Sequence, residues 1–272
     1  MASFSAGPGT GRYRRTCMPV LAVVLSLLSA GCSTAPQGHH TAGIPRPDRA
    51  GLAVLNFKNT TARDQASQFQ PWEYGIATML STDLEALGVF NIVERERLRD
   101  IVREYELQKS DLVDKETVVK LGRLTAAKYI LTGSFAEMNG ELRMAVQIFS
   151  VEEGIQLGAA SMNGETDKFF MIEKKLFVKV IDFLEVMLDE EDKARIVNSV
   201  ETKSVDASLR NYSGEMAMAR AEELKRIGKN KDAIILLHEA REKFSEALEY
   251  DPNFLRAKKN LATLAMAIPI TL

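Results

Sequence analysis

The chain has 272 residues, of which 46% are hydrophobic and 26% charged, and this is enough apolar material for one or two packed domains. Its 35 basic and 37 acidic residues give a net charge of −2, so no strong positive field favours nucleic acid as a partner. The two cysteines, Cys17 and Cys32, both lie near the start of the chain. Beyond Cys32 the sequence therefore excludes an internal disulfide and a cysteine-based zinc site.

The first 31 residues have the three parts of an export signal. Arg12–Arg15 give it a positive start, Val20–Leu28 form an apolar run, and Ser29–Gly31 are small residues placed directly before Cys32. The apolar run is shorter than the roughly 20 residues that a membrane-spanning helix needs. We therefore expect residues 1–31 to be a signal peptide that is cleaved after Gly31.

The stretch SAGC resembles a bacterial lipobox, in which a lipoprotein signal peptidase cuts before a cysteine that becomes acylated. Ser29 stands where leucine is most common, and a plain secretory signal with an incidental cysteine is the alternative. The resemblance implies a stable lipid anchor on Cys32. Ser33 after the cysteine implies sorting to the outer membrane, on its periplasmic face. Residues 32–50, with their proline, glycine and small polar residues, are predicted to be a flexible tether.

Residues 51–190 alternate short apolar runs with helical periodicities. Strands are predicted at Gly51–Phe57, Val89–Val93, Lys128–Phe135, Glu141–Val151 and Ile155–Asn163, with hairpin turns at Asn139-Gly140 and Glu153-Gly154. Helices are predicted at Trp72–Leu87, around Leu98–Tyr105, around Val118–Leu124 and over Lys168–Leu188, and a loop at residues 59–71. This order predicts an α+β fold, a mixed α/β sandwich.

Four blocks of this region stand in the order found in CsgG-like proteins: LAVLNF, FNIVERERLRDIVREYELQKSDLVD, KLGRLTAAKYILTGS and VQIFSVEEGIQLGAAS. Residues 51–188 therefore resemble this family, which includes the curli-secretion channel and whose fold is similar to the N-terminal domain of TolB. The resemblance implies a bacterial envelope protein and leaves assembly into a homo-oligomer open.

The connections between strands depart from the channel-forming member of that family. There each subunit inserts two long amphipathic hairpins into the membrane, and each hairpin needs about twenty residues. Here only AEMNGE joins the third and fourth strands, and SMNGETDKFF runs straight into a helix. The sequence thus resembles the periplasmic domain of the family without its pore-forming hairpins.

The end of the chain is predicted to be all-α. Residues 191–212 are polar without a clear period and are predicted to be a connector, and residues 213–268 a helical segment with helices at Ser213–Ile227, Lys231–Tyr250 and Asn253–Ala267. The segment resembles a tetratricopeptide repeat at Gly228, Ala240, Phe244, Ala247 and Pro252. The turn at Gly228 comes early for that repeat, so either the second helix is longer than usual or only half of the repeat is present. A generic helical hairpin is the alternative.

The stretch NIVERERLRDIVREYE, residues 91–106, carries charges of both signs around an apolar stripe. Its oppositely charged and like-charged pairs largely cancel in energy, so the apolar stripe must hold this helix on the core. The simplest interpretation of the charges is a solvated helix face. Ring-forming relatives suggest a second hypothesis, an assembly surface formed by Arg95, Glu96, Arg99, Asp100 and Arg103.

Beyond Cys32 the sequence has no phosphate-binding loop, no dinucleotide fingerprint and no nucleophile elbow. We therefore predict a non-catalytic protein without a cofactor or a metal. It would be an outer-membrane-anchored periplasmic lipoprotein that acts as an interaction or scaffold factor in envelope assembly or secretion, with other envelope proteins as partners. The second hypothesis is an oligomeric component of a CsgG-type secretion channel, which the short connections weigh against. An enzyme is the third, although no set of acidic residues marks an active site.

Overall fold

The computed structural model describes residues 48–104 and 115–267, which belong to one compact unit. The predictions for Gly31 and Cys32, and for nearly all of the tether, lie outside these residues. Among the helices that the structure describes, none combines the length and the apolar character needed to span a bilayer.

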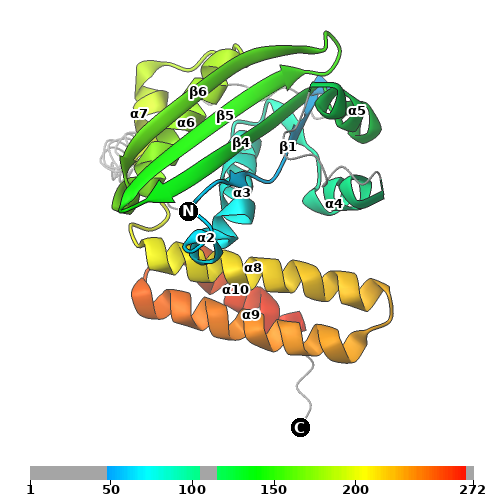
Figure 1. Cartoon of the computed structure of the whole chain (residues 1–272), viewed down its shortest axis with the longest axis vertical. Coiled ribbons are helices and arrows are strands. Elements are labelled where there is room, and N and C mark those ends of the chain that lie inside the picture. Colours follow the sequence, from blue (N-terminus) through cyan, green and yellow to red (C-terminus); the bar gives the residue numbers. More distant parts are fainter. Residues whose placement is uncertain (1–47, 105–114, 268–272) are drawn as a thin grey trace, which may run out of the picture. The chain divides into compact units, whose positions relative to one another are not determined.

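Strands and helices alternate at first, and the chain ends in helices, as Figure 1 shows. The strands are β1 (Ala50–Val54), β2 (Lys58–Asn59), β3 (Phe90–Ile92), β4 (Tyr129–Met138), β5 (Glu141–Ser150) and β6 (Ile155–Glu165). The helices are α2 (Ala66–Phe69), α3 (Pro71–Ala86), α4 (Arg95–Glu104), α5 (Lys115–Thr125), the 3₁₀ turn η3 (Thr166–Lys168), α6 (Phe169–Phe183), α7 (Glu190–Asn198), α8 (Val205–Arg226), α9 (Asn230–Tyr250) and α10 (Leu255–Ala267).

A single mixed sheet organises the first part of the chain, in the order β3-β1-β4-β5-β6. β3, β1 and β4 are parallel, because helices connect them, whereas β4, β5 and β6 form an antiparallel meander. β2 forms a short parallel pair with the middle of β4, at Ser134 and Phe135. This mixed sheet followed by helices confirms the predicted α+β fold class.

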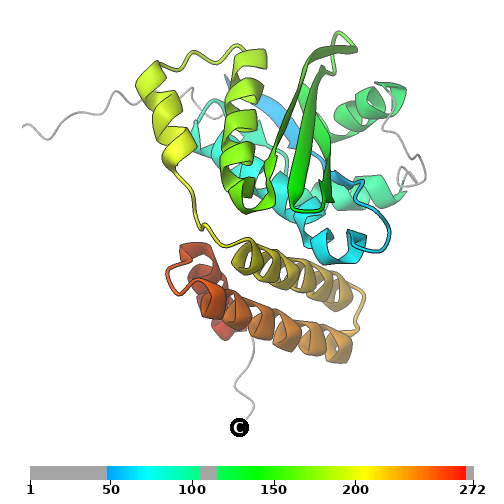
Figure 2. The same cartoon turned by 60° about the vertical axis from the view of Figure 1, so that its left-hand side comes forward.

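Alternate residues of the central strands enter two separate cores on opposite faces of the sheet. Leu52 of β1 and Leu131 of β4 pack with α3 and α6, whereas Ala53 and Ile130 pack with α4 and α5. Figure 2 shows α6 on one side of the sheet and α4 and α5 on the other. This arrangement explains why β1 reads as a continuous apolar run, since both of its faces are covered.

The hairpin predicted at Asn139-Gly140 is confirmed. Both residues have positive φ, 56° and 85°, and Met138 of β4 pairs with Glu141 of β5 directly beside them. β6 continues through η3 into α6. Both connections are therefore as short as the sequence predicted.

Two predicted segments differ from the structure. The loop expected at residues 59–71 contains α2 and takes part in β2. The helix expected to reach Leu188 ends at Phe183, because Glu185 has a φ of 55° and the chain closes in a Schellman arrangement. The Val186 amide donates to the Ile181 carbonyl at 3.2 Å, as that motif requires.

The prediction of a connector at residues 191–212 also differs from the structure. Residues 190–198 form α7, and α8 begins at Val205 rather than at Ser213. The Ser204 side chain caps α8 by accepting a hydrogen bond from the Ala207 amide. The first turns of α8 are helical because Leu209 and Tyr212 pack into the same core as α3 and α6.

Candidate functional site

Helix α3 is covered on more than one side, by the sheet and by the helices at the end of the chain. Trp72, at its start, is fully buried and stacks on Phe169 of α6, with the ring centroids 4.0 Å apart. The Trp72 indole Nε1 donates a hydrogen bond to Ser208 Oγ of α8 at 3.1 Å. One side chain thus joins the sheet core to the helical segment.

Tyr212 of α8 packs its ring against α3 at Gly75. A Cβ atom added to Gly75 would stand 2.3 Å from Cδ2 of the tyrosine ring, so only glycine permits this approach of the two helices. Tyr212 is fully buried, and its hydroxyl has no hydrogen-bond partner. Burial raises the pKa of that hydroxyl well above its usual value, so Tyr212 is a neutral, largely apolar side chain of the core.

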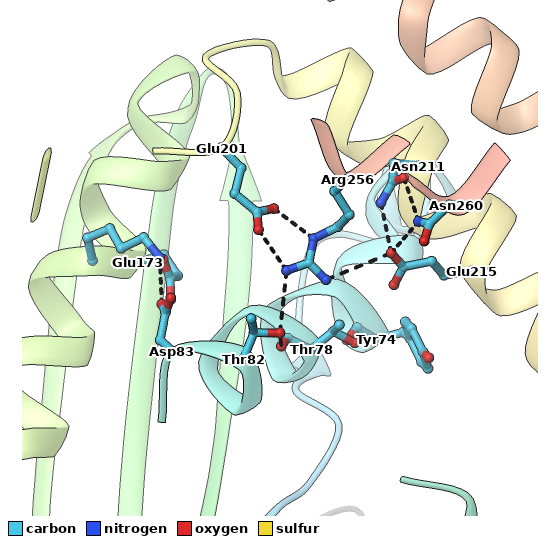
Figure 3. A network of polar contacts seen from close by, with 11 residues as sticks. Tyr74, Thr78, Thr82, Asp83, Glu173, Glu201, Asn211, Glu215, Arg256 and Asn260 are labelled. Atoms are coloured by element: carbon cyan, nitrogen blue, oxygen red, sulfur yellow. Dashed lines mark hydrogen bonds and ion pairs between the residues drawn. The ribbon is translucent and has the colours of Figure 1, made fainter. Parts of the chain in front are cut away.

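Beside Tyr212, Arg256 of α10 binds carboxylates on both sides, as Figure 3 shows. Its Nε and Nη2 atoms donate to Glu201 at 2.7 and 2.8 Å, and Nη2 also reaches Thr82 Oγ1 of α3 at 3.4 Å. Its Nη1 lies 4.0 Å from Glu215 Oε1 of α8. Burial alone would lower the pKa of Arg256, but the contacts with Glu201 raise it above the ordinary value, so the cation is permanent.

Glu215 is held by neutral groups as well as by Arg256. Its Oε1 atom accepts hydrogen bonds from Asn211 Nδ2 at 3.0 Å and from Asn260 Nδ2 at 2.8 Å. Asn211 belongs to α8 and Asn260 to α10, so this carboxylate ties the two helices together. Burial raises the pKa of Glu215, and Arg256 opposes that increase.

A second buried group lies between α6 and α3. Lys174 Nζ of α6 is 2.5 Å from Asp83 Oδ2 of α3 and 3.6 Å from Glu173 Oε2. Glu173 is completely buried, and neither of its oxygens accepts a hydrogen bond. Burial raises the pKa of Glu173 to about 8. Since Lys174 has its short contact with Asp83, Glu173 is the acid that keeps its proton.

These residues form what we call the polar network: Asp83, Glu173, Lys174, Glu201, Asn211, Glu215, Arg256 and Asn260. They come from α3, α6, α8, α10 and the segment before α8, and they lie between the helices that cover the sheet and the helical segment. No group of three or more potential metal ligands occurs among the described residues. Because the charged groups are directed at one another, the arrangement is chemically suited to fixing helices in one position.

The five residues predicted to form an assembly surface on α4 differ in burial and in the groups that they contact. Arg95 packs its guanidinium 4.2 Å from the centre of the Tyr74 ring and donates to Asn56, and burial lowers its pKa. Glu96 and Asp100 both bind Arg226 of α8, at 3.3 and 2.9 Å. The Nε atom of Arg99 is buried without a partner, and the side chain of Arg103 lies outside the described residues. Three of the five thus contact other parts of the same chain.

The residues predicted to be repeat-like lie in the helical segment. Ala240, Phe244 and Ala247 are fully buried on α9, Gly228 has a φ of 78° in the turn after α8, and Pro252 is exposed beyond α9. α9 is one unbroken helix of 21 residues. Assignment of the segment to a tetratricopeptide repeat stays a prediction.

Sequence reasoning missed the polar network, although helix α8, which carries Asn211 and Glu215, left a signal at its start. Ser204 followed by Val205, Leu209 and Tyr212 is a helix cap followed by apolar residues at helical spacing, which predicts a helix that begins at 205. Glu173 gave no signal, because FFMIEKKLF looks like an ordinary amphipathic helix whose charges face water.

A family model described as curli production assembly/transport component CsgG matches residues 39–144. The match confirms the resemblance to CsgG-like proteins for that stretch, which includes α4 and ends within β5. No match is found among curated proteins.

Several solved structures are similar to parts of the chain. The C-terminal domain of LpoB from Escherichia coli is 18% identical, with a TM-score of 0.34, over 43% of this chain and 83% of that domain. TolB from Acinetobacter baumannii is 12% identical, with a TM-score of 0.37, over 55% of this chain and 31% of TolB. The PelC dodecamer from Paraburkholderia phytofirmans is 14% identical, with a TM-score of 0.30, over 53% of this chain and 93% of PelC. At these TM-scores the fold assignment rests on the sheet topology described above.

Proposed function

Because residues 39–144 match the CsgG family model, we propose that this chain is a CsgG-like envelope lipoprotein that acts as a non-catalytic interaction or scaffold factor. The anchor would be an acylated Cys32 in the outer membrane, with the domain on the periplasmic face, as the SAGC stretch suggests. Other envelope proteins would be its partners, in envelope assembly or secretion.

The observation that carries the scaffold proposal is the polar network. Its charged residues bind one another across α3, α6, α8 and α10, so they are occupied in holding helices rather than in meeting a substrate. A scaffold has to present its partner surface in one conformation, and the ion pairs of Arg256 and Lys174 hold the helices that would carry that surface. In this proposal the lipid fixes the chain to the membrane, residues 32–50 give it reach, and the docked helices present the partner surface.

The experiment is crosslinking and pulldown from intact envelopes, comparing the wild type with Cys32→Ala. We expect Cys32→Ala to leave the outer-membrane fraction and to lose the crosslinked partners. Cys17→Ala is the matched control, because that cysteine lies inside the predicted signal and would be removed. If Cys32→Ala stays in the outer-membrane fraction with the same partners, the anchoring proposal is wrong.

A second candidate is an oligomeric component of a CsgG-type secretion channel. The match to a family of assembly/transport components favours a channel component, whereas the two-residue turn at Asn139-Gly140 leaves no room for a membrane hairpin and counts against one. Leakage from liposomes that contain the purified lipidated protein would support the channel. A monomer that causes no leakage would leave the scaffold proposal in place.

A further inference from the structure

The turn between α8 and α9 exposes an unusual set of apolar side chains. Ile227 is 61% exposed, Ile234 41% and Ile235 66%, and all three lie within nine consecutive residues. Isolated exposed apolar residues are common on protein surfaces, whereas three exposed β-branched side chains so near one another in the chain suggest a contact surface. We call residues 225–235 the α8–α9 tip.

Lysines surround these isoleucines. Lys225, Lys229 and Lys231 are exposed, while Asp232 is the one acidic residue between positions 225 and 235. Lys231, Ile234 and Ile235 are three and four residues apart on α9, so they share one face of the helix. On this face of α9 an ammonium group therefore lies beside two exposed apolar side chains.

The tip protrudes from the helices that carry it. Gly228 forms the turn with a φ of 78°, and a Cβ atom added to it would meet nothing within 4 Å. Arg226, also in the tip, forms ion pairs with Glu96 and Asp100 of α4. These ion pairs hold one side of the tip on the sheet domain and leave the three lysines directed to solvent.

We propose that the α8–α9 tip binds a lipid bilayer that contains anionic headgroups. The isoleucines would enter the boundary between headgroups and acyl chains, and the lysine ammonium groups would reach the lipid phosphates from their long stems. A convex turn suits this fluid surface, whereas a protein partner would need a matching cavity. A second copy of the chain is a poorer occupant, because it would place lysines opposite lysines.

This contact is independent of the lipid on Cys32, and the test separates the two. The mature chain with Cys32→Ala is sedimented with vesicles of phosphatidylcholine alone or of phosphatidylcholine mixed with phosphatidylglycerol. We expect binding only to the vesicles that contain phosphatidylglycerol, and we expect that binding to weaken as salt is raised. Equal binding to both kinds of vesicle, or binding to neither, would overturn the proposal without affecting the anchor on Cys32.

Two pairs of variants locate the contact. Lys229→Glu/Lys231→Glu should weaken binding at least about tenfold, since each lysine near an anionic surface contributes about a fivefold factor. Its matched control is Lys258→Glu/Lys259→Glu, at exposed positions of α10. Ile227→Ser/Ile235→Ser should also lose binding, while Leu255→Ser/Met266→Ser, which changes two other exposed apolar residues, should not. If tip and control variants bind alike, or if the tip variants lose only a protein partner in envelope pulldowns, the bilayer proposal is wrong.

Discussion

Replacing Glu173 with glutamine should remove a large part of the pH dependence of folding. The pKa of this buried acid is about 8 in the folded chain, against an ordinary value of 4.5. Because the folded-state pKa is the higher one, the folded chain binds more protons than the unfolded chain between these values. The stability that comes from the protonated acid is therefore complete below pH 4.5 and is lost as the pH rises through 8.

The size of the effect follows from the gap between the two pKa values. At about 1.4 kcal/mol for each pH unit, the gap sets an upper limit of roughly 5 kcal/mol, and the folded-state pKa already includes the attraction to Lys174. Glutamine stays neutral at every pH, and like the protonated acid it has no hydrogen-bond partner at this position. Glu173→Gln should thus be close to the wild type in stability at pH 5 and the more stable protein at pH 9.

Urea denaturation of the mature Cys32→Ala chain at pH 5, 7 and 9 measures this difference. The control is Glu242→Gln, which changes an exposed glutamate of α9 and should follow the wild-type curve. If the free energy of unfolding has the same pH slope in Glu173→Gln and in the wild type, Glu173 is ionised in the folded chain and our account of its burial is refuted.

Three further substitutions test the structure at separate points. Gly75→Ala places a Cβ atom 2.3 Å from the Tyr212 ring, so we expect a loss of about 1–3 kcal/mol in urea denaturation and faster proteolysis of the helical segment; unchanged stability would mean that α3 and α8 do not pack this closely. Arg256→Ala removes the partner of two carboxylates. A buried pair would lose about 3–5 kcal/mol, and the partial exposure of Glu201 reduces the loss expected here. A change below about 0.5 kcal/mol, which is typical of surface pairs, would contradict a structural role for Arg256. Glu185→Gly relieves a positive φ of 55° and should raise the thermal midpoint, with a gain of about 1 kcal/mol; a lower midpoint would show that the side chain of Glu185 contributes more than its backbone costs.

The sequence predicted the sheet well because its strands carry strong local signals. Asn139-Gly140 has the residues that a two-residue hairpin needs, and the β5 residues Leu142 and Met144 alternate with polar ones as a half-buried strand requires. Helix ends were harder to predict. Glu185 adopts a conformation that favours glycine, so no residue type announced the end of α6.

The polar network could not be predicted from the sequence, because its members are distant in the chain. Asp83 and Lys174 are separated by 91 positions, and Asn211 and Asn260 by 49. Each is an ordinary polar residue on an amphipathic helix until the fold brings the helices together. Burial was equally hidden, since the charges of Glu173 and Lys174 gave no sign that this face of α6 meets α3 rather than water.

The charged face of α4 shows how such a pattern changes meaning once the fold is known. As a free surface, its mixed charges would set the register of a neighbouring subunit. In the structure Glu96 and Asp100 bind Arg226, so α4 contacts the end of α8, and the assembly surface on α4 stays a prediction. Reversing either acid would therefore disturb the chain itself before it disturbed a partner. Beyond Arg226, the lysines and isoleucines of the α8–α9 tip have the composition that we propose for a membrane contact.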